Sequence, residues 1–425
     1  LKDSLDRFTT LTSEHFQIRM EVKEAAVYGP RVVELLEQAW TELIMRYDFT
    51  PEVPVYVEIY PRVDDFAVRT FGVPDVAGFL GVCFGKVVTA NSPATRKENP
   101  GSWESVLWHE FCHVVTLQKT RNRMPRWLSE GISVFEERRA DSRWGQHMDP
   151  GFRDRILVGN VTPVAELSSA FLTAKSGDDL SFAYYESSML VEHLVTVHGL
   201  PALNAILKDL NDGIRINDAL ERHTKGLDEL EQSFAKYLDK LATAYASGVE
   251  FKTEEMAAAK LIDLEAADAF LKQHPHSFGA MRLYAALLIK ADRLDEAEAQ
   301  LKKLIALVPQ DDNLDGPRRL LAEVYKQRGQ TELEMQILTE HLHYSADDLV
   351  AALRLQELCE LQKQQDQVVE LGRTIFAIDP FQPLALTRTS SAAEAIGKIN
   401  DAVSALTSLL QIQKDDAARL PFHIA

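Results

Sequence analysis

The chain has 425 residues, of which 46% are hydrophobic and 26% are charged, a composition typical of a folded protein with two or three domains. Lys and Arg number 46 against 64 Asp and Glu, and the formal net charge of -18 disfavours nucleic acid and anionic membrane surfaces as partners. No apolar run approaches the roughly 18 residues of a membrane-spanning helix, so we expect a soluble chain without a membrane span.

The first half of the chain begins with alternating strands and helices. Alternating apolar and polar residues over 14–22 predict a half-buried strand, and apolar residues at three- and four-residue spacing predict a helix from about Pro30 to Tyr47. A second strand is expected over 54–60, a short helix over 63–71, and a third strand over 81–91. This order predicts a small mixed sheet beside a helical subdomain.

The third strand, which Gly85 interrupts, is expected to border the cleft. An exposed strand edge there would bind an extended peptide through main-chain hydrogen bonds. An ordinary internal strand explains the same pattern equally well.

A helix that follows Ser102, a suitable N-cap, carries His109-Glu110-Phe111-Cys112-His113. This is the HExxH pattern, in which two histidines four residues apart share one helix face and can bind one zinc ion. Glu110 is the candidate general base that takes a proton from a zinc-activated water. Cys112 points away from His113, so we interpret it as a small core residue and not as a ligand.

The next helix contains Trp127-Leu128-Ser129-Glu130-Gly131. Together with HExxH, this run resembles the gluzincins, the peptidase clan that includes thermolysin and the aminopeptidase N relatives, in which the glutamate of W-L-x-E-G completes the metal site. The resemblance implies that His109, His113 and Glu130 hold Zn2+ in a zincin catalytic domain. Two imidazoles and one carboxylate leave a coordination position open for water, as in catalytic zinc sites.

The spacing leaves alternatives for the third ligand. Only residues 114–129 separate His113 from Glu130, slightly fewer than in the best-known gluzincins, so the connecting loop must be tight. Glu136 and Glu137 are alternative ligands. Because two arginines follow them, we interpret them as part of a solvated, ion-paired helix end.

The segment from Ala183 to Leu194, ahead of Gly199, resembles the gluzincin helix whose leading tyrosine stabilises the tetrahedral intermediate. Aligning that tyrosine on the glycine favours Tyr184 over Tyr185 as the donor to the carbonyl oxygen. Two packing tyrosines are a further alternative. His193 is interpreted as a surface or core histidine, with a transition-state role as its alternative.

Aminopeptidase-type gluzincins carry an acidic residue in the cleft strand that holds the substrate's amino terminus. Between Asp75 and Glu98 this chain has no acidic residue, which favours an endopeptidase or a different substrate anchor. Lys86 and Arg96 could pair with acidic substrates, although solvated surface positions explain them better.

From about residue 250 the pattern becomes helical and repeats. Ala285, Ala322, Gln356 and Ser390 occupy equivalent positions of repeats that resemble the tetratricopeptide type, with steps of 37, 34 and 34 residues. The longer step falls at Asp311-Asp312-Asn313. Such helix pairs stack into a solenoid that commonly binds peptide or protein. A generic helical bundle packed on the enzyme is the alternative.

We therefore predict an α+β protein with a gluzincin-like, or peptidase MA-like, domain over 1–250 and a tetratricopeptide-like solenoid over 251–425. The sheet should occupy 1–95 and the helical zinc-binding part 96–250. The expected activity is zinc-dependent peptide hydrolysis, and the repeats would bind a protein partner or the substrate. Alternatives are a non-catalytic interaction scaffold with a peptidase-like fold and a zinc hydrolase of a non-peptide substrate.

The location of the protein is left open by the sequence. The resemblance is to bacterial proteins that are often exported, and a chain that begins at Leu1 is compatible with removal of a signal peptide. Cys83, Cys112 and Cys359 form no disulfide framework and favour a reducing interior. An exported or periplasmic location is slightly favoured over the cytoplasm.

Overall fold

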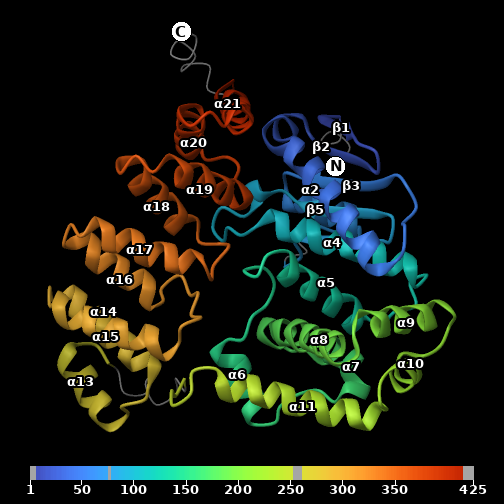
Figure 1. Cartoon of the computed structure of the whole chain (residues 1–425), viewed down its shortest axis with the longest axis horizontal. Helices are drawn as coiled ribbons and strands as arrows, with labels where there is room; N and C mark the ends of the chain where they lie inside the picture. The colour runs from blue at the N-terminus through green and yellow to red at the C-terminus, as the bar shows by residue number, and fades with distance from the viewer. Residues whose placement is uncertain (1–5, 75–77, 252–260, 415–425) are drawn as a thin grey trace. The chain divides into compact units, whose positions relative to one another are not determined.

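The computed structural model describes residues 6–74, 78–251 and 261–414, which are mostly helical and include one small mixed sheet, as expected for an α+β protein (Figure 1). The chain forms two compact units. The first consists of the described parts of Leu1–Gln146, Thr162–Phe234 and Cys359–Ala425, and the second consists of those of His147–Val161 and Ala235–Leu358. The domain boundary at residue 250 stays a prediction.

The strands are β1 (Phe8–Thr12), β2 (Phe16–Glu21), β3 (Val55–Tyr60), β4 (Gly81–Cys83) and β5 (Val87–Asn91). The helices of the N-terminal half are α2 (Val22–Tyr47), α3 (Val63–Phe71), η1 (Pro93–Thr95), α4 (Trp103–Lys119), α5 (Arg126–Ala140), α6 (Pro150–Leu157), η2 (Val164–Glu166), α7 (Leu167–Thr173), α8 (Gly177–His198), α9 (Leu200–Asn211), α10 (Ile216–His223) and α11 (Leu227–Ala244). The later helices are α13 (Leu264–Gln273), α14 (Phe278–Lys290), α15 (Leu294–Leu307), α16 (Pro317–Gln327), α17 (Thr331–Leu342), α18 (Leu349–Leu361), α19 (Gln365–Ile378), α20 (Pro383–Ala395) and α21 (Ile399–Lys414).

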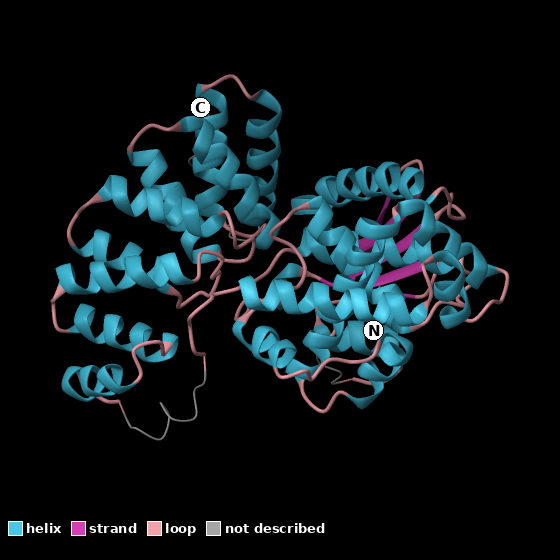
Figure 2. Cartoon of the chain, turned by 60° about the horizontal axis from the view of Figure 1, so that its bottom comes forward, coloured by secondary structure: helices cyan, strands magenta, loops and turns pink. Residues whose placement is uncertain are grey.

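The strand order in the sheet is β1-β2-β3-β5-β4, and the strands are the magenta arrows among helices in Figure 2. β2, β3 and β5 are parallel, whereas β1 and β4 pair antiparallel with their neighbours. β1 was not expected from the sequence. The single strand predicted over 81–91 is wrong, because β4 and β5 form a hairpin whose turn contains Gly85 at φ +80°. This turn requires the left-handed conformation that glycine adopts readily. β4 is one of the two edge strands of this sheet, and β1 is the other.

The predicted start of the first long helix is also wrong. The helix begins at Val22 and contains Pro30 in its interior. The side chain of Glu21 caps the helix by accepting hydrogen bonds from the backbone N–H groups of Lys23 and Glu24. The proline suggests a helix start, but the Glu21 cap lies about two and a half turns earlier.

Apolar side chains from three elements hold α4 against one face of the sheet. Phe16 of β2 makes edge contacts with Phe111 of α4 (5.2 Å between ring centroids) and with Trp40 of α2 (6.0 Å). All three side chains are buried. The HExxH helix is therefore anchored through Phe111, which directly follows Glu110.

The opposite face of the sheet carries a polar network beneath α3. Glu58 of β3 accepts hydrogen bonds from Arg19 of β2 (3.2 Å), from Arg69 of α3 (2.7 Å) and from the Tyr60 hydroxyl (2.8 Å). Glu58 is buried, so these donors satisfy a carboxylate that would otherwise be costly to remove from water.

The last helices of the chain belong to the first compact unit. The Trp103 indole, at the start of α4, donates to the backbone carbonyl of Phe376 (2.9 Å), and the Ser408 hydroxyl of α21 donates to that of Val27 (2.7 Å). α21 also packs against α2 and α20. The start of α4 is thus held by a residue that lies 273 positions later in the chain.

From α14 onward, the predicted repeat positions fall in alternate helices. Ala285, Ala322, Gln356 and Ser390 lie in α14, α16, α18 and α20, each the first helix of a pair, and all four side chains are buried. This agrees with the predicted helix pairing. The tetratricopeptide assignment itself stays a prediction.

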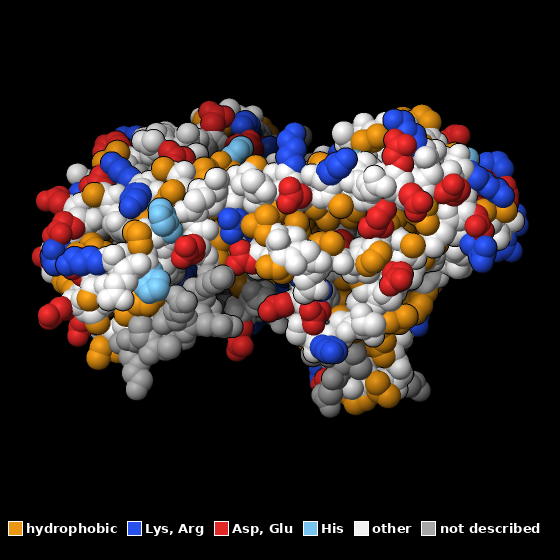
Figure 3. All heavy atoms as spheres, turned by 90° about the horizontal axis from the view of Figure 1, so that it is seen from below, with side chains coloured by type: hydrophobic (Ala, Val, Ile, Leu, Met, Phe, Trp, Pro, Cys, Tyr) orange, Lys and Arg blue, Asp and Glu red, His pale blue; other side chains and the backbone are white. Residues whose placement is uncertain are grey.

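Within the described residues, no single helix has the length and apolar character of a membrane span; α8 and α9 meet both criteria only as a pair bent by 118°. On the face drawn in Figure 3, basic side chains are interspersed with acidic ones.

Candidate metal centre

Two packed helices, α4 and α5, supply the candidate ligands. The Ser102 hydroxyl accepts a hydrogen bond from Ser105 N (3.2 Å) and caps α4, as the sequence predicts. α5 packs against both α4 and α8. Gly131 permits the α5–α8 contact, because a Cβ atom at this position would lie 2.6 Å from the Ser187 carbonyl oxygen. The glycine of W-L-S-E-G therefore places the helix that carries Glu130.

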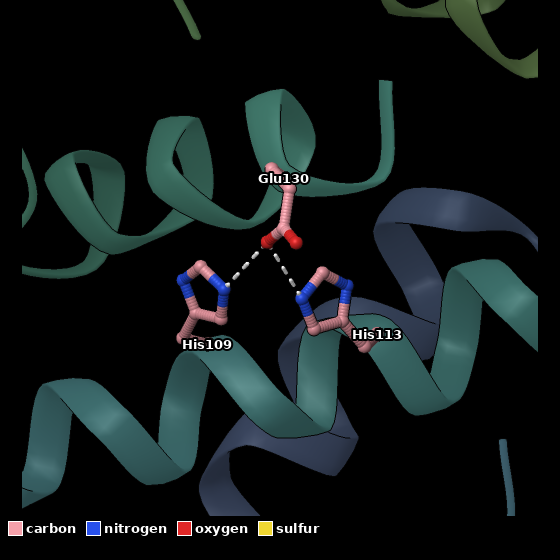
Figure 4. Close-up of side chains that lie close together, drawn as sticks. All are labelled: His109, His113 and Glu130. Atoms are coloured by element: carbon pink, nitrogen blue, oxygen red, sulfur yellow. Dashed lines mark hydrogen bonds and ion pairs between the residues drawn. The ribbon is translucent and has the colours of Figure 1, made fainter. Parts of the chain in front are cut away.

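The three predicted ligands converge (Figure 4). Glu130 Oε2 lies 3.3 Å from His109 Nε2 and 3.1 Å from His113 Nε2. His109 and His113 rise from consecutive turns of α4, and Glu130 points down to them from α5. Among the described residues, this is the one group of three or more His, Cys, Asp or Glu side chains close enough together to hold a metal ion.

The outer nitrogens of both imidazoles are engaged. His109 Nδ1 contacts Glu137 Oε1 at 2.6 Å. His113 Nδ1 contacts the hydroxyls of Ser129 (2.9 Å) and Ser133 (3.2 Å). Such contacts fix ring orientation, so both Nε2 atoms are directed at the same point.

Glu136 and Glu137 are not on a solvated helix end, and that prediction is wrong. Glu137 is buried behind His109. Glu136 is fully buried, and its carboxylate meets the Tyr47 hydroxyl (2.7 Å), Arg46 and Arg139. Glu136 and Glu137 are followed by two arginines in the sequence, but both carboxylates face inward and contact different partners.

The carboxylates make this site strongly attractive to a cation. Burial lowers the pKa of His109, but Glu137, Glu130 and Glu110 outweigh burial and raise it well above its ordinary value. Burial raises the pKa of Glu130, but His113 and His109 outweigh burial and hold it well below its ordinary value.

Glu110 lies beside the ligands against the edge strand. A Cβ atom on Gly81 of β4 would lie 2.6 Å from Glu110 Cγ, so the glycine leaves space for this side chain. Glu110 Oε2 is buried and meets no hydrogen-bond partner among the described residues. Burial raises the pKa of Glu110, and His113 and His109 offset this rise only in part. A buried carboxylate with an unpaired oxygen is suited to accept a proton.

The geometry separates Tyr184 from Tyr185. Tyr184 is partly exposed, and its hydroxyl accepts a hydrogen bond from Arg126 (3.3 Å), which also contacts Glu130. Tyr185 is buried against Phe182. Tyr184 is thus the tyrosine connected to the candidate ligands.

The remaining candidate residues of the sequence have contacts other than the three candidate ligands. His193 Nε2 contacts the Ser233 hydroxyl of α11 (2.9 Å), and its side chain is buried, as for a core histidine. Cys112 is buried in the core, as predicted. Lys86 Nζ lies 3.6 Å from Oε2 of the exposed Glu52. Arg96 Nη1 donates a hydrogen bond to the Gly101 carbonyl oxygen (3.2 Å).

The part of the chain that contains the candidate site matches a known protein family. Residues 49–239 match the Peptidase MA superfamily. This stretch contains all three converging side chains, Glu110 and Tyr184, and the match supports a gluzincin-like fold and a peptidase-like function for it. No curated protein matches the chain significantly.

Solved structures give weak likenesses. The crystal structure of MamA shows 16% identity, covering 36% of this chain and 89% of its own, at a TM-score of 0.30. Yeast LTA4 hydrolase in complex with bestatin shows 13% identity, covering 96% of this chain and 67% of its own, at a TM-score of 0.31. Native leukotriene A4 hydrolase from Saccharomyces cerevisiae shows 14% identity, covering 97% of this chain and 67% of its own, also at a TM-score of 0.31. These TM-scores are too low to define a shared fold.

Sequence reasoning missed Arg126, the supporting role of Glu137 and the contact between Gly81 and Glu110. One signal for Glu137 was available, because it follows Glu130 by seven residues, two turns along the same helix face. The other two contacts join elements that only tertiary packing brings together.

Proposed function

We propose that this chain is a zinc-dependent peptidase, in which His109, His113 and Glu130 hold the metal and Glu110 is the general base. The observation that carries the proposal is the convergence of both Nε2 atoms on Glu130 Oε2 beside the unpaired, buried oxygen of Glu110. Peptidase-like function is also what the Peptidase MA match suggests.

The residues present suit zinc. Donor atoms about 2.0–2.2 Å from a tetrahedral ion lie about 3.3–3.6 Å apart, and the histidine–glutamate distances of 3.1 and 3.3 Å are close to this value. Glu137 is a carboxylate that only accepts hydrogen bonds, so it holds a proton on His109 Nδ1 and leaves Nε2 to bind a metal. The Ser129 and Ser133 hydroxyls can accept from His113 Nδ1 in the same way. Two nitrogens and one carboxylate oxygen form the ligand set of a catalytic zinc site.

In the proposed reaction, a bound zinc ion supplies a Lewis acid that lowers the pKa of a water and polarises the scissile carbonyl. Glu110 accepts the proton of the attacking water at its free oxygen and later gives it to the leaving amine. The Tyr184 hydroxyl would donate a hydrogen bond to the carbonyl oxygen as negative charge develops there, and it would keep its proton. Glu137, Ser129 and Ser133 keep the two imidazoles in place.

We further propose that an extended peptide binds along β4. Leu80 O accepts from Asn91 N (2.8 Å) and Phe84 N donates to Val87 O (2.7 Å), so residues 80, 82 and 84 turn their polar groups toward β5. Gly81 and Cys83 then turn theirs to the free edge. Because Gly81 touches Glu110, a peptide added there would pass beside the base. With no acidic anchor between 75 and 98, this geometry supports an endopeptidase.

The helix pairs from α14 to α21 are proposed to be tetratricopeptide-like and to bind a protein partner or the substrate. The support is the 34-residue step, at which Ala322, Gln356 and Ser390 are all buried in first helices.

The test combines metal analysis with peptide hydrolysis. The wild type should bind one zinc ion per chain and cleave internally quenched peptides. Glu110→Gln should keep zinc and lose at least about 100-fold in kcat, because the general base is gone. Glu34→Gln, at a side chain that is 71% exposed, is the control and should behave as the wild type. Full activity in Glu110→Gln would refute the assignment.

A non-catalytic scaffold is the competing function. It would be supported if zinc-loaded wild type cleaved nothing in a broad peptide library while a protein partner bound the region from α14 onward.

A further inference from the structure

Arg126, the first residue of α5, contacts three groups at the edge of the metal centre. Its Nη2 donates to the Tyr184 hydroxyl oxygen (3.3 Å), and its Nε donates to Glu130 Oε1 (3.3 Å). The guanidinium carbon lies 4.8 Å from the centroid of the Phe171 ring. The Glu130 oxygen that Arg126 contacts is not the one that meets the histidines.

Phe171 of α7 supports both members of the Arg126–Tyr184 pair. Its ring makes an edge contact with the Tyr184 ring at 5.2 Å between centroids and 83° between planes. A guanidinium over an aromatic face and an edge-to-face ring pair each add stabilisation. The arginine and the tyrosine are thus held at one aromatic side chain, although they come from helices 58 residues apart in the sequence.

The direction of the hydrogen bond matters for chemistry. An arginine can only donate, so the Tyr184 oxygen is the acceptor and its own proton must point elsewhere. Among the described residues, no acceptor takes that proton. Burial raises the pKa of Tyr184 to about 12, and Glu130 adds to the rise, whereas Arg126 opposes it. Arg126 therefore orients the phenol and also makes it a stronger hydrogen-bond donor.

We propose that Arg126 is a positioning residue that aims the Tyr184 hydroxyl at the carbonyl oxygen of the scissile bond. The inference rests on the proposed peptidase function and adds to it a residue that acts through Tyr184. It implies that loss of Arg126 lowers kcat, because the donor is needed in the transition state, and leaves KM and zinc content unchanged.

The experiment is a double-mutant cycle in full-length, zinc-loaded protein with internally quenched peptides as substrate. Tyr184→Phe should lower kcat by about 100-fold, and Arg126→Met, which keeps the length of the side chain without its donors, should lower it by about 10–100-fold. The double variant should be no slower than Tyr184→Phe, because the arginine acts through the tyrosine. Arg126→Lys should recover part of the rate.

Two controls separate positioning from general damage. Arg215→Met, at an arginine that is 86% exposed and pairs with Asp218 three residues later, should match the wild type. Zinc content and the thermal unfolding midpoint should stay at the wild-type value in Arg126→Lys, which keeps the test valid if Arg126→Met folds poorly.

Several results would overturn the inference. Additive effects in the cycle would show that Arg126 acts independently of Tyr184. A change in KM alone would make Arg126 a substrate anchor, and zinc loss in both Arg126 variants would make it a support for Glu130. If the wild type hydrolyses no peptide, the proposed function fails together with this inference. If the wild type is active and the cycle is additive, this inference alone fails.

Discussion

The charged end of α5 and the charged start of α15 look alike in sequence but lie in different surroundings. In α5, Glu136 and Glu137 are buried, and each contacts specific side chains of other helices. In α15, Glu296 pairs with Arg293 three residues earlier, and both side chains are about half exposed. The same residue types thus lie beside a candidate metal centre in one region and on a solvated helix surface in the other. The predictions below test this difference.

The largest effect is expected at the buried carboxylate behind His109. Glu137→Gln removes the charge that faces His109 Nδ1, so zinc affinity should fall by about 10–100-fold. Competition with a chelator measures the affinity. Glu42→Gln changes a partly exposed carboxylate of α2 that pairs with Arg139 of α5, and it should leave zinc affinity unchanged. Equal affinities for Glu137→Gln and the wild type would show that this contact does not support the ligand.

A second prediction concerns the packing that places Glu130. Gly131→Ala would set a methyl group 2.6 Å from the Ser187 carbonyl oxygen, and the backbone must shift to admit it. We expect the free energy of unfolding to fall by about 2–3 kcal/mol in urea titrations. Gly177→Ala, at the start of α8, meets nothing within 4 Å and should leave stability unchanged or slightly higher. Similar losses for both variants would contradict the close approach of α5 and α8.

In the second compact unit, the buried carboxylate of Asp348 should contribute more to the free energy of unfolding than the exposed carboxylates do. Asp348 Oδ2 contacts His341 Nε2 and Arg319 Nε, each at 2.9 Å. Burial raises the pKa of Asp348, but His341, the Ala351 N–H group and Arg319 outweigh burial and lower it below its ordinary value. A lowered folded-state pKa means that the charge stabilises the protein above the unfolded-state pKa and that this stability is lost as the pH falls through the folded-state value.

Asp348→Asn should therefore lower the free energy of unfolding by about 1–3 kcal/mol at pH 7. The difference from the wild type should begin to shrink below about pH 4, where the carboxylate of the unfolded chain takes up a proton, and should continue to shrink as the pH falls toward the lowered pKa of the folded state. Urea unfolding at pH 7 and pH 3 measures both values. An equal loss at the two pH values would mean that the charge of Asp348 contributes no stability.

The smallest effect is expected at the exposed pair of α15. Arg293→Ala removes the contact with Glu296, whose atoms lie 2.6 Å apart within one helix turn. Exposed pairs of this kind contribute little, because water screens the charges and both side chains lose freedom. The urea midpoint should be indistinguishable from that of the wild type. A clear decrease would show that the surface charges of this region stabilise it as buried charges do.

The local features of the site were predictable because short sequence spacings determine them. His109 and His113 lie on one helix face by helix geometry, and Ser102 caps that helix as expected. The strand periods of 14–22 and 54–60 located β2 and β3. Helix starts were less predictable, because the Glu21 side chain caps α2 ahead of the proline that suggested a later start.

The sequence by itself determined the composition of the candidate centre: two histidines one turn apart, a base beside them and a glutamate on the next helix. Only the tertiary structure decided that Glu137 faces His109, that Gly81 adjoins Glu110 and that Arg126 contacts Tyr184. The reason is physical. Periodicity and capping act within about one helix turn, whereas these contacts join elements whose distance is set by core packing around Phe16, Trp40 and Phe111 and by the close approach of α5 to α8.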